Sequence, residues 1–292
     1  MIIKYLSIPP PDFTFYFLFP KRIISMNRTI KLITLSLVCL VVFSQCQDDS
    51  GIIVKMGIED YSSSEQKVIG DNLHKFIQDK KSDHIILTKN QNYGPAYDFV
   101  EKVFTQAVRT EGVTHLDFYN WSVHILVNDE FKNAFILPGG HLYIYTGLLK
   151  FIKTDAELFA VLTREIALAD LGTVGKFLGE EHGASQMGDV LLKNPDADEV
   201  GIIKTLEQIP YDPEVTEAID LYSIELACLN YNFDDQAIVD LINRSANKEI
   251  EWFATRPGYE NRSQKIIGLT TECFSSSSNQ EAYEVQVIRN LP

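Results

Sequence analysis

Glu165 is the residue whose type and position best fit a catalytic role in this 292-residue sequence. Arg164 and Leu168 flank it four residues apart, a spacing that places two side chains on one face of a helix, as for a pair of metal ligands. A carboxylate can act as general base on water, but bulk water has a pKa of about 16, against about 7 when bound to zinc. Arginine offers no lone pair and leucine has no donor atom. Hydrolysis at Glu165 therefore depends on whether other residues hold a metal ion.

A helix from Thr154 to Leu171 is predicted to position Glu165. Thr154 and Glu157 form the S/T-x-x-E pattern of a capping box, which marks a helix start. Apolar residues then recur at helical spacing and predict a stripe that faces the core: Phe159, Leu162, Ile166 and Ala169. Strands are predicted just before this helix at residues 133–137 and 141–145, joined by a Pro-Gly-Gly turn.

The remaining pattern is mainly helical. Helices are predicted at about residues 63–79, 95–109, 216–229 and 234–244, and strands at 117–127 and 282–288. Residues 172–210, where Gly and Asp recur, show no clear periodicity. We therefore expect an α+β fold, mainly helical, with a small antiparallel sheet beside the Glu165 helix.

The chain is acidic, with a formal net charge of −14. A surface this negative argues against nucleic acid as a partner, because phosphate backbones are bound by Lys and Arg. It also argues against electrostatic docking to anionic lipid.

The N-terminal region has the pattern of a targeting signal. Arg28 and Lys31 precede an apolar run over residues 32–43 that is too short to span a bilayer and is typical of a signal peptide. Met26 is therefore the expected start. Cys46 follows the run where cleavage should fall, as in a lipobox, although a secreted protein with an incidental Cys46 is the alternative.

These features predict three regions. Residues 1–46 form the targeting segment, 47–61 a tether and 62–292 the folded domain. We expect a lipoprotein of the bacterial cell envelope, anchored to the membrane by a lipid on Cys46. Cys228 and Cys273, the cysteines of the folded domain, are expected either to pair in an oxidising compartment or to stay as buried thiols.

Several motifs together resemble the gluzincin metallopeptidases of the HtpX, BepA and CAAX-prenyl-protease type. The resemblance covers about residues 60–270, and NAFILPGGHLYIYTGLL over 133–149 is its most specific motif. The other motifs are Trp121-Ser-Val-His-Ile, Arg164-Glu-Ile-Ala-Leu, Glu214-Val-Thr-Glu-Ala-Ile-Asp, Tyr231-Asn-Phe-Asp and Thr255-Arg-Pro with Arg262.

The resemblance implies a zinc site that this sequence lacks. Glu165 matches the family's general base, but Arg164 and Leu168 stand where the family has its two helix His ligands. Thr216 stands at the Glu ligand position and Arg256 at the His of T-H-P. The changes affect the whole ligand set, so we expect a pseudoenzyme without a cofactor, with zinc bound only if the family activity survives. We also expect Arg164 to form an ion pair with Glu214 or Glu217.

A peptide-binding edge is the second implication of the resemblance. In the family, a peptide lies along the strand before the Pro-Gly-Gly turn, and such backbone pairing needs no catalysis. The corresponding residues are Asn133, Ala134, Phe135, Pro138, Gly139 and Gly140.

We therefore predict a catalytically inactive metallopeptidase-like protein that binds a peptide or an envelope protein, or acts as a scaffold. Two alternatives stay open. One is an active metalloendopeptidase with non-standard ligands, for which His124 and His141 on neighbouring strands could approach each other. The other is a purely structural envelope protein.

Overall fold

The computed structural model describes residues 61–90, 92–208, 213–230, 234, 236–245, 264, 266, 268 and 278–292. Met26, Cys46, Arg256, Arg262 and Cys273 lie outside these residues, as do residues 231–233, so the expectations for them stay predictions. Cys228 is disulfide-bonded, which excludes a free thiol there. Within the described part of the chain, no helix is long and apolar enough to cross a membrane.

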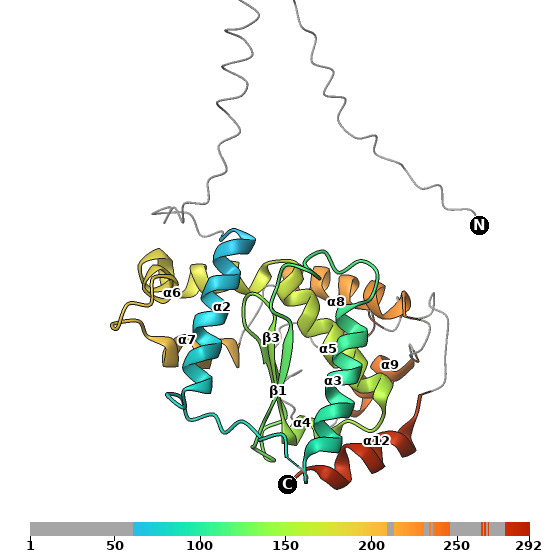
Figure 1. Ribbon diagram of the computed structural model, residues 1–292. Helices are drawn as coiled ribbons and strands as arrows, with labels where there is room; N and C mark the ends of the chain where they lie inside the picture. The colour runs from blue at the N-terminus through green and yellow to red at the C-terminus, as the bar shows by residue number, and fades with distance from the viewer. Residues whose placement is uncertain are drawn as a thin grey trace, which may run out of the picture. The chain divides into compact units, whose positions relative to one another are not determined.

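A three-stranded sheet lies in the middle of the described fold (Figure 1). Its strands are β1 (Ser122–Leu126), β2 (Ala134–Ile136) and β3 (His141–Tyr145), in the order β1-β3-β2. β2 pairs with β3 antiparallel through the tight turn, but β1 pairs with β3 in parallel. The sheet is mixed rather than wholly antiparallel, because the chain reverses direction before and after β2, and β3 then enters between β2 and β1, with which it is parallel.

The turn between β2 and β3 depends on glycine. Gly139 has a φ of +79° and Gly140 a φ of +101°, values that side chains with a Cβ rarely adopt. A Cβ on Gly140 would lie 2.8 Å from the Trp121 ring. Gly70, in the helix α2 (Ser63–Gln78), approaches the same turn, and a Cβ there would lie 1.5 Å from the carbonyl oxygen of Pro138.

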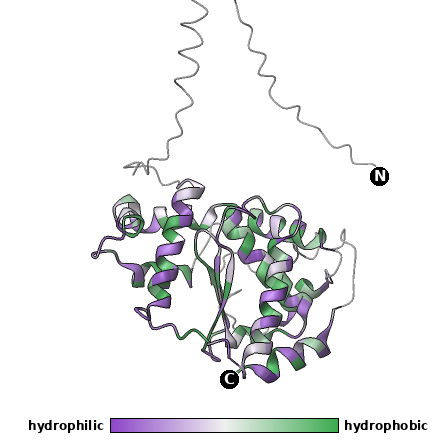
Figure 2. Cartoon of the chain, viewed as in Figure 1, coloured by the Kyte–Doolittle hydropathy of each residue, from purple (hydrophilic) through white to green (hydrophobic). Residues whose placement is uncertain are grey.

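Helices surround the sheet, and the α+β, mainly helical fold class is confirmed (Figure 1). They are α2 (Ser63–Gln78), α3 (Gly94–Val108), α4 (Thr146–Phe151), α5 (Asp155–Asp170), α6 (Thr173–Leu191), α7 (Glu199–Leu206), α8 (Pro213–Cys228), α9 (Gln236–Ser245), α12 (Gln280–Gln286) and the 3₁₀ helix η2 (Ile288–Asn290). Hydrophilic and hydrophobic residues alternate along the peripheral helices in Figure 2, as expected for elements with one face in water.

The strand predicted at residues 282–288 was wrong. Residues 282–288 alternate like a strand, but Asn279 caps a helix there by accepting a hydrogen bond from the Ala282 N–H at 2.8 Å. Tyr283 and Val287, one helical turn apart, are both fully buried, while Val285 is exposed. Residues 172–208, for which the sequence shows no clear periodicity, contain α6 and α7, although Gly183 interrupts α6 with a φ of +74°.

α5 is the central helix of the fold. Each of its residues from Ala156 to Asp170 is buried, and it packs against α3, α6, α8, α9 and β2. The predicted cap is present, since the Thr154 hydroxyl accepts a hydrogen bond from the Glu157 N–H at 3.1 Å. A helix buried on all sides can show the amphipathic pattern only weakly, because every face meets apolar neighbours.

Asp170 fixes the C-terminal end of α5. Its carboxylate accepts hydrogen bonds from the backbone N–H groups of Thr114 and His115, at 2.9 and 2.8 Å, and from the Tyr222 hydroxyl at 2.6 Å. Burial alone would raise the pKa of Asp170, but these hydrogen bonds outweigh it, so the pKa lies below its ordinary value. The carboxylate thereby ties α5 to the loop before β1 and to α8.

Replacing Asp170 with Asn should destabilise the fold by about 2–3 kcal/mol, because an amide cannot accept the same set of charge-assisted hydrogen bonds. The Asp170 contribution is complete above the unfolded-state pKa of about 3.9 and is lost as pH falls through the lower folded-state pKa. Urea unfolding between pH 3 and 7 should therefore show a shallower acid limb for D170N. D98N, at an exposed carboxylate, should stay within about 0.5 kcal/mol of the wild type, and an equal loss in both variants would contradict the role of Asp170.

Candidate functional site

The middle of α5 holds a buried charge cluster. Arg164 and Glu165 are each only 1% exposed. The Arg164 Nε–H donates to Asp220 Oδ1 on α8 at 3.2 Å, and its Nη1 lies 3.5 Å from Glu165 Oε1. An ion pair between Arg164 and an acidic residue of α8 is thus present, and it includes Asp220, which lies beyond Glu214 and Glu217 on that helix.

The residues at the expected ligand positions do not fit a zinc ion. Leu168 has no donor atom and Thr216 offers a neutral hydroxyl, and both are buried. Zinc is bound in proteins by Cys, His, Asp or Glu, and Glu165 and Asp220, the carboxylates in contact with Arg164, belong to that set. Both carboxylates already face the Arg164 guanidinium, whose positive charge would repel a dication.

β2, the strand expected to bind a peptide, is an edge of the sheet, but its residues are covered. Asn133, Ala134 and Phe135 are each 2% exposed. The Asn133 Oδ1 accepts a hydrogen bond from the Ala134 N–H at 2.9 Å, and its Nδ2 donates to the Glu207 carbonyl at 2.8 Å. A peptide that adds to this edge must first displace the Asn133 side chain.

The Pro138-Gly139-Gly140 turn is also buried, beneath α2 and Trp121. Its backbone lies close to Gly70 and Lys67. The turn therefore supports the position of α2, and peptide binding there stays a prediction.

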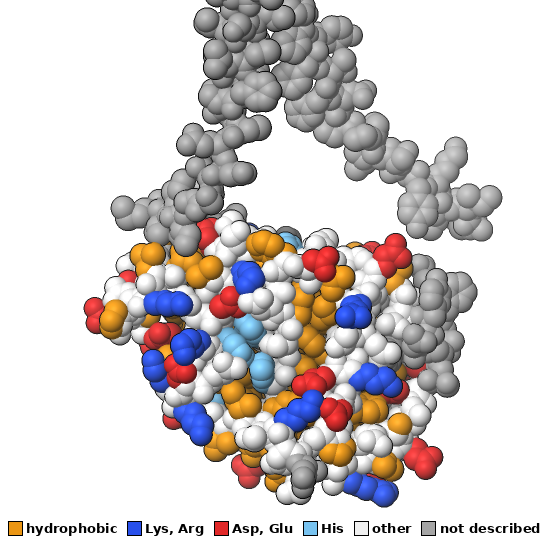
Figure 3. Space-filling model, in the orientation of Figure 1, with side chains coloured by type: hydrophobic (Ala, Val, Ile, Leu, Met, Phe, Trp, Pro, Cys, Tyr) orange, Lys and Arg blue, Asp and Glu red, His pale blue; other side chains and the backbone are white. Residues whose placement is uncertain are grey.

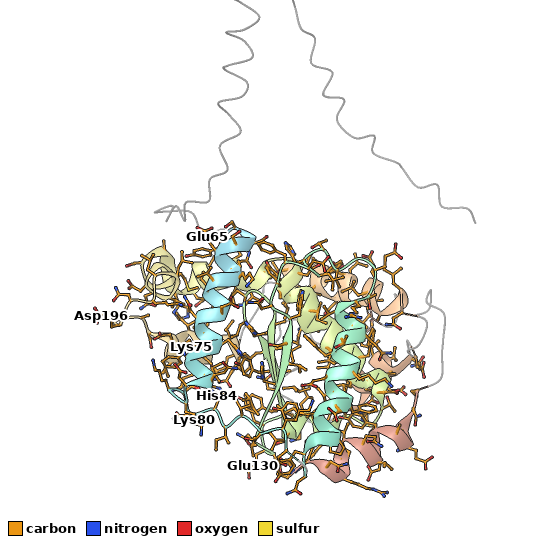
Figure 4. All side chains as sticks on the ribbon, in the orientation of Figure 1. Glu65, Lys75, Lys80, His84, Glu130 and Asp196 are labelled. Carbon is orange, nitrogen blue, oxygen red and sulfur yellow. The ribbon has the colours of Figure 1, made fainter. Side chains whose placement is uncertain are left out.

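A polar cluster that the sequence did not single out lies beyond the C-terminal end of α2 (Figure 4). His84 Nε2 lies 3.0 Å from Glu207 Oε1, and the Tyr145 hydroxyl donates to the same carboxylate. Burial, with the nearby Glu207 charge, raises the pKa of Tyr145. The cluster lines a pocket of about 340 Å³ together with Phe131 and Lys204.

Three histidines meet on the sheet. His74 from α2, His124 from β1 and His141 from β3 place one potential ligand atom each within 4.8 Å of one another. The prediction that His124 and His141 approach each other is confirmed. His74 was missed, because only the packing of α2 on the sheet brings it to the other two.

Comparison with known proteins identifies relatives. Residues 98–171, which run from α3 through the sheet to the end of α5, match peptidase family M48. The mitochondrial metalloendopeptidase OMA1 of Danio rerio is 22% identical over 202 residues, which cover 62% of this chain and 42% of the fish protein. OMA1 of Schizosaccharomyces pombe is 28% identical over 108 residues, covering 37% of this chain and 30% of the yeast protein. OMA1 of Arabidopsis thaliana is 41% identical over 56 residues, covering 19% and 11%.

These matches confirm the resemblance to zinc metallopeptidases that the motifs indicated. The chain spans less than half the length of these curated relatives.

The expected location in a bacterial cell envelope was wrong, since these relatives are named as mitochondrial enzymes. The expectation came from a basic pair, an apolar run and Cys46. A basic N-terminal segment poor in acidic residues is also typical of mitochondrial transit peptides, so that pattern does not discriminate between the two destinations.

Replacing Arg164 with Met should destabilise the protein by about 3–5 kcal/mol, because the substitution leaves buried carboxylates without the guanidinium charge. Urea unfolding at pH 7 measures the difference. Arg289 is 67% exposed, and R289M should change the unfolding free energy by less than about 0.5 kcal/mol. A similarly small change in R164M would show that the buried ion pair is not needed for stability.

Proposed function

We propose that this chain, a relative of the M48 metallopeptidases, keeps the metallopeptidase-like fold but does not hydrolyse peptide bonds at α5, and acts as a peptide- or protein-binding module. The observation that supports the loss of hydrolysis is the Arg164 guanidinium, which lies buried against Asp220 and Glu165. In this arrangement a fixed positive charge takes the place of the metal.

The Glu165 carboxylate is poorly placed to act on water in this arrangement. Its carboxylate is 1% exposed and lies 3.5 Å from an Arg164 nitrogen. A general base must reach a water molecule beside the substrate, whereas this carboxylate is enclosed by protein and directed at the guanidinium. Removal of Glu165's charge should therefore leave any reaction of the protein unchanged.

The binding role is supported by the position of β2. In the described sheet, β2 pairs only with β3, and the Ala134 N–H bonds to the Asn133 side chain instead of to a strand. An extended peptide that displaced this side chain would find a free backbone donor at the sheet edge.

An active metalloendopeptidase with non-standard ligands is the second candidate, and the three histidines favour it. None of the α5 residues Arg164, Glu165 and Leu168 lines the groove that contains them. A hydrolase built on the histidines would need a base other than Glu165.

The two candidate functions predict different results in a casein cleavage assay. The full chain, supplied with zinc, should leave fluorescently labelled casein uncut, and E165Q should behave identically. Zinc-dependent cleavage that E165Q abolishes would refute the proposal. Cleavage that E165Q leaves unchanged and that H124N abolishes would favour the second candidate.

Binding at the β2 edge is tested in the absence of cleavage. Labelled, unfolded casein fragments should bind the full chain, and the affinity should fall in A134P, because proline removes the backbone N–H that an added strand would use. Circular dichroism and the urea midpoint establish that A134P is folded. Equal affinity in folded A134P and wild type would exclude this edge as the binding surface.

A further inference from the structure

His74, His124 and His141 come from three elements that converge on one face of the sheet. Along β3, His141 and Tyr143 point to this face while Leu142 points to the other, as alternation requires. His124 lies opposite Tyr143 in the parallel register with β1. The His74 ring stacks on the His141 ring with 4.0 Å between centroids, and lies 4.7 Å from that of His124.

We propose that these three histidines form a binding site for a zinc-class transition-metal ion, separate from the α5 site. Zn–N bonds of about 2.0–2.1 Å require ligand nitrogens about 3.4 Å apart around a tetrahedral ion. One potential ligand nitrogen from each ring lies within 4.8 Å of the others. The His74 and His141 rings are parallel, with an interplanar angle of 3°, so one of them must turn before both in-plane lone pairs point at a single ion. Imidazole nitrogens suit Zn²⁺, Cu²⁺ and Ni²⁺, whereas Mg²⁺ and Ca²⁺ prefer oxygen.

The outer nitrogens of two rings already have partners of the kind seen around metal ligands. His141 Nε2 lies 2.9 Å from Asp71 Oδ1, which leaves Nδ1 directed toward the cluster. His74 Nδ1 lies 2.6 Å from the Tyr143 hydroxyl, which leaves Nε2 as its second nitrogen. A carboxylate or hydroxyl on the far nitrogen orients a ligating ring and raises its basicity.

The Ser122 hydroxyl lies between a ring nitrogen of His141 and a ring nitrogen of His124. Its Oγ lies 2.7 Å from His141 Nδ1 and 3.0 Å from His124 Nε2. The hydroxyl has one proton and can donate to only one of these nitrogens. The other nitrogen then donates its own N–H to the Ser122 oxygen, so a metal ion bound by both rings would replace these two hydrogen bonds.

Burial affects the pKa of all three rings in the same direction. Burial, and then the neighbouring rings, lower the pKa of His74 to about 3 and that of His124 to about 4. Burial also lowers the pKa of His141, although Asp71 acts in the opposite direction.

The cluster is accessible through a groove of about 1030 Å³ whose walls include Phe104, Tyr119 and Trp121. Figure 3 shows histidine side chains at the surface of this face, beside a strip of apolar side chains. Three protein ligands would leave a fourth coordination position for water or another ligand, and all three histidines line the groove through which it would enter. The site does not depend on whether α5 is catalytically inactive.

Zinc binding to the full chain, after treatment with a chelator and dialysis, tests the proposal. Isothermal titration should show one zinc ion per chain, and Co²⁺ should give the visible absorption of a tetrahedral nitrogen site. H124N/H141N should remove both signals. D71N, which keeps all three ligands, should weaken zinc binding roughly 10- to 100-fold.

H182N is the matched control, because His182 on α6 contacts Gln186 and Thr205 and lies outside the cluster. It should bind zinc like the wild type. If H124N/H141N does not fold, the single variant H124N and D71N take its place. No saturable binding by the wild type, binding unchanged in H124N and D71N, or binding lost in D220N but kept in H124N would each overturn the proposal.

Discussion

The Arg164 guanidinium is buried in the centre of the fold, where an unpaired charge would strongly destabilise the folded state. α5 is enclosed by helices and by β2, and Arg164 is the largest of the fully buried side chains described. A cation in such surroundings requires anions within contact distance, and Glu165 and Asp220 meet that requirement from α5 and α8. The pair need not add stability compared with an apolar replacement. The charges of Arg164, Glu165 and Asp220 are nevertheless interdependent, because replacing one of these residues alone would leave a buried charge without its partner.

The sheet separates two environments. On the side of α5, apolar side chains such as Leu142 and Ile144 are fully buried. On the side of α2, the same strands present His124, His141 and Tyr143, which form a polar, hydrogen-bonded layer. Because successive side chains of a strand point to opposite faces, β1 and β3 contribute apolar residues to the core and polar residues to the groove.

The sequence predicted what depends on local pattern. The Thr154 cap, the Pro-Gly-Gly turn and the helices around Glu65, Phe104 and Leu241 follow from short-range signals, and the structure confirms them. The same reasoning failed at Val285, where alternation over a few residues imitated a strand that a helix cap overrides.

The candidate sites were harder to predict because they depend on packing. The acidic partner Asp220 was on the expected helix, but which carboxylate reaches Arg164 depends on how α8 is rotated against α5. His74 lies far from His124 in sequence, and no pattern in either segment indicates that α2 crosses the sheet at that residue. Contacts between elements of this kind have no signature in a single sequence.

The close approach of Gly70 to the Pro138 carbonyl has a consequence for the whole α2 side of the sheet. Gly70 and His74 are one helical turn apart and therefore lie on the same face of α2. A Cβ at Gly70 would lie 1.5 Å from the Pro138 oxygen. Helix α2 can therefore pack this closely against the turn only because residue 70 has no side chain. The lack of a side chain at Gly70 thus determines how close α2 lies to the sheet, and with it the position of the His74 imidazole relative to β1 and β3.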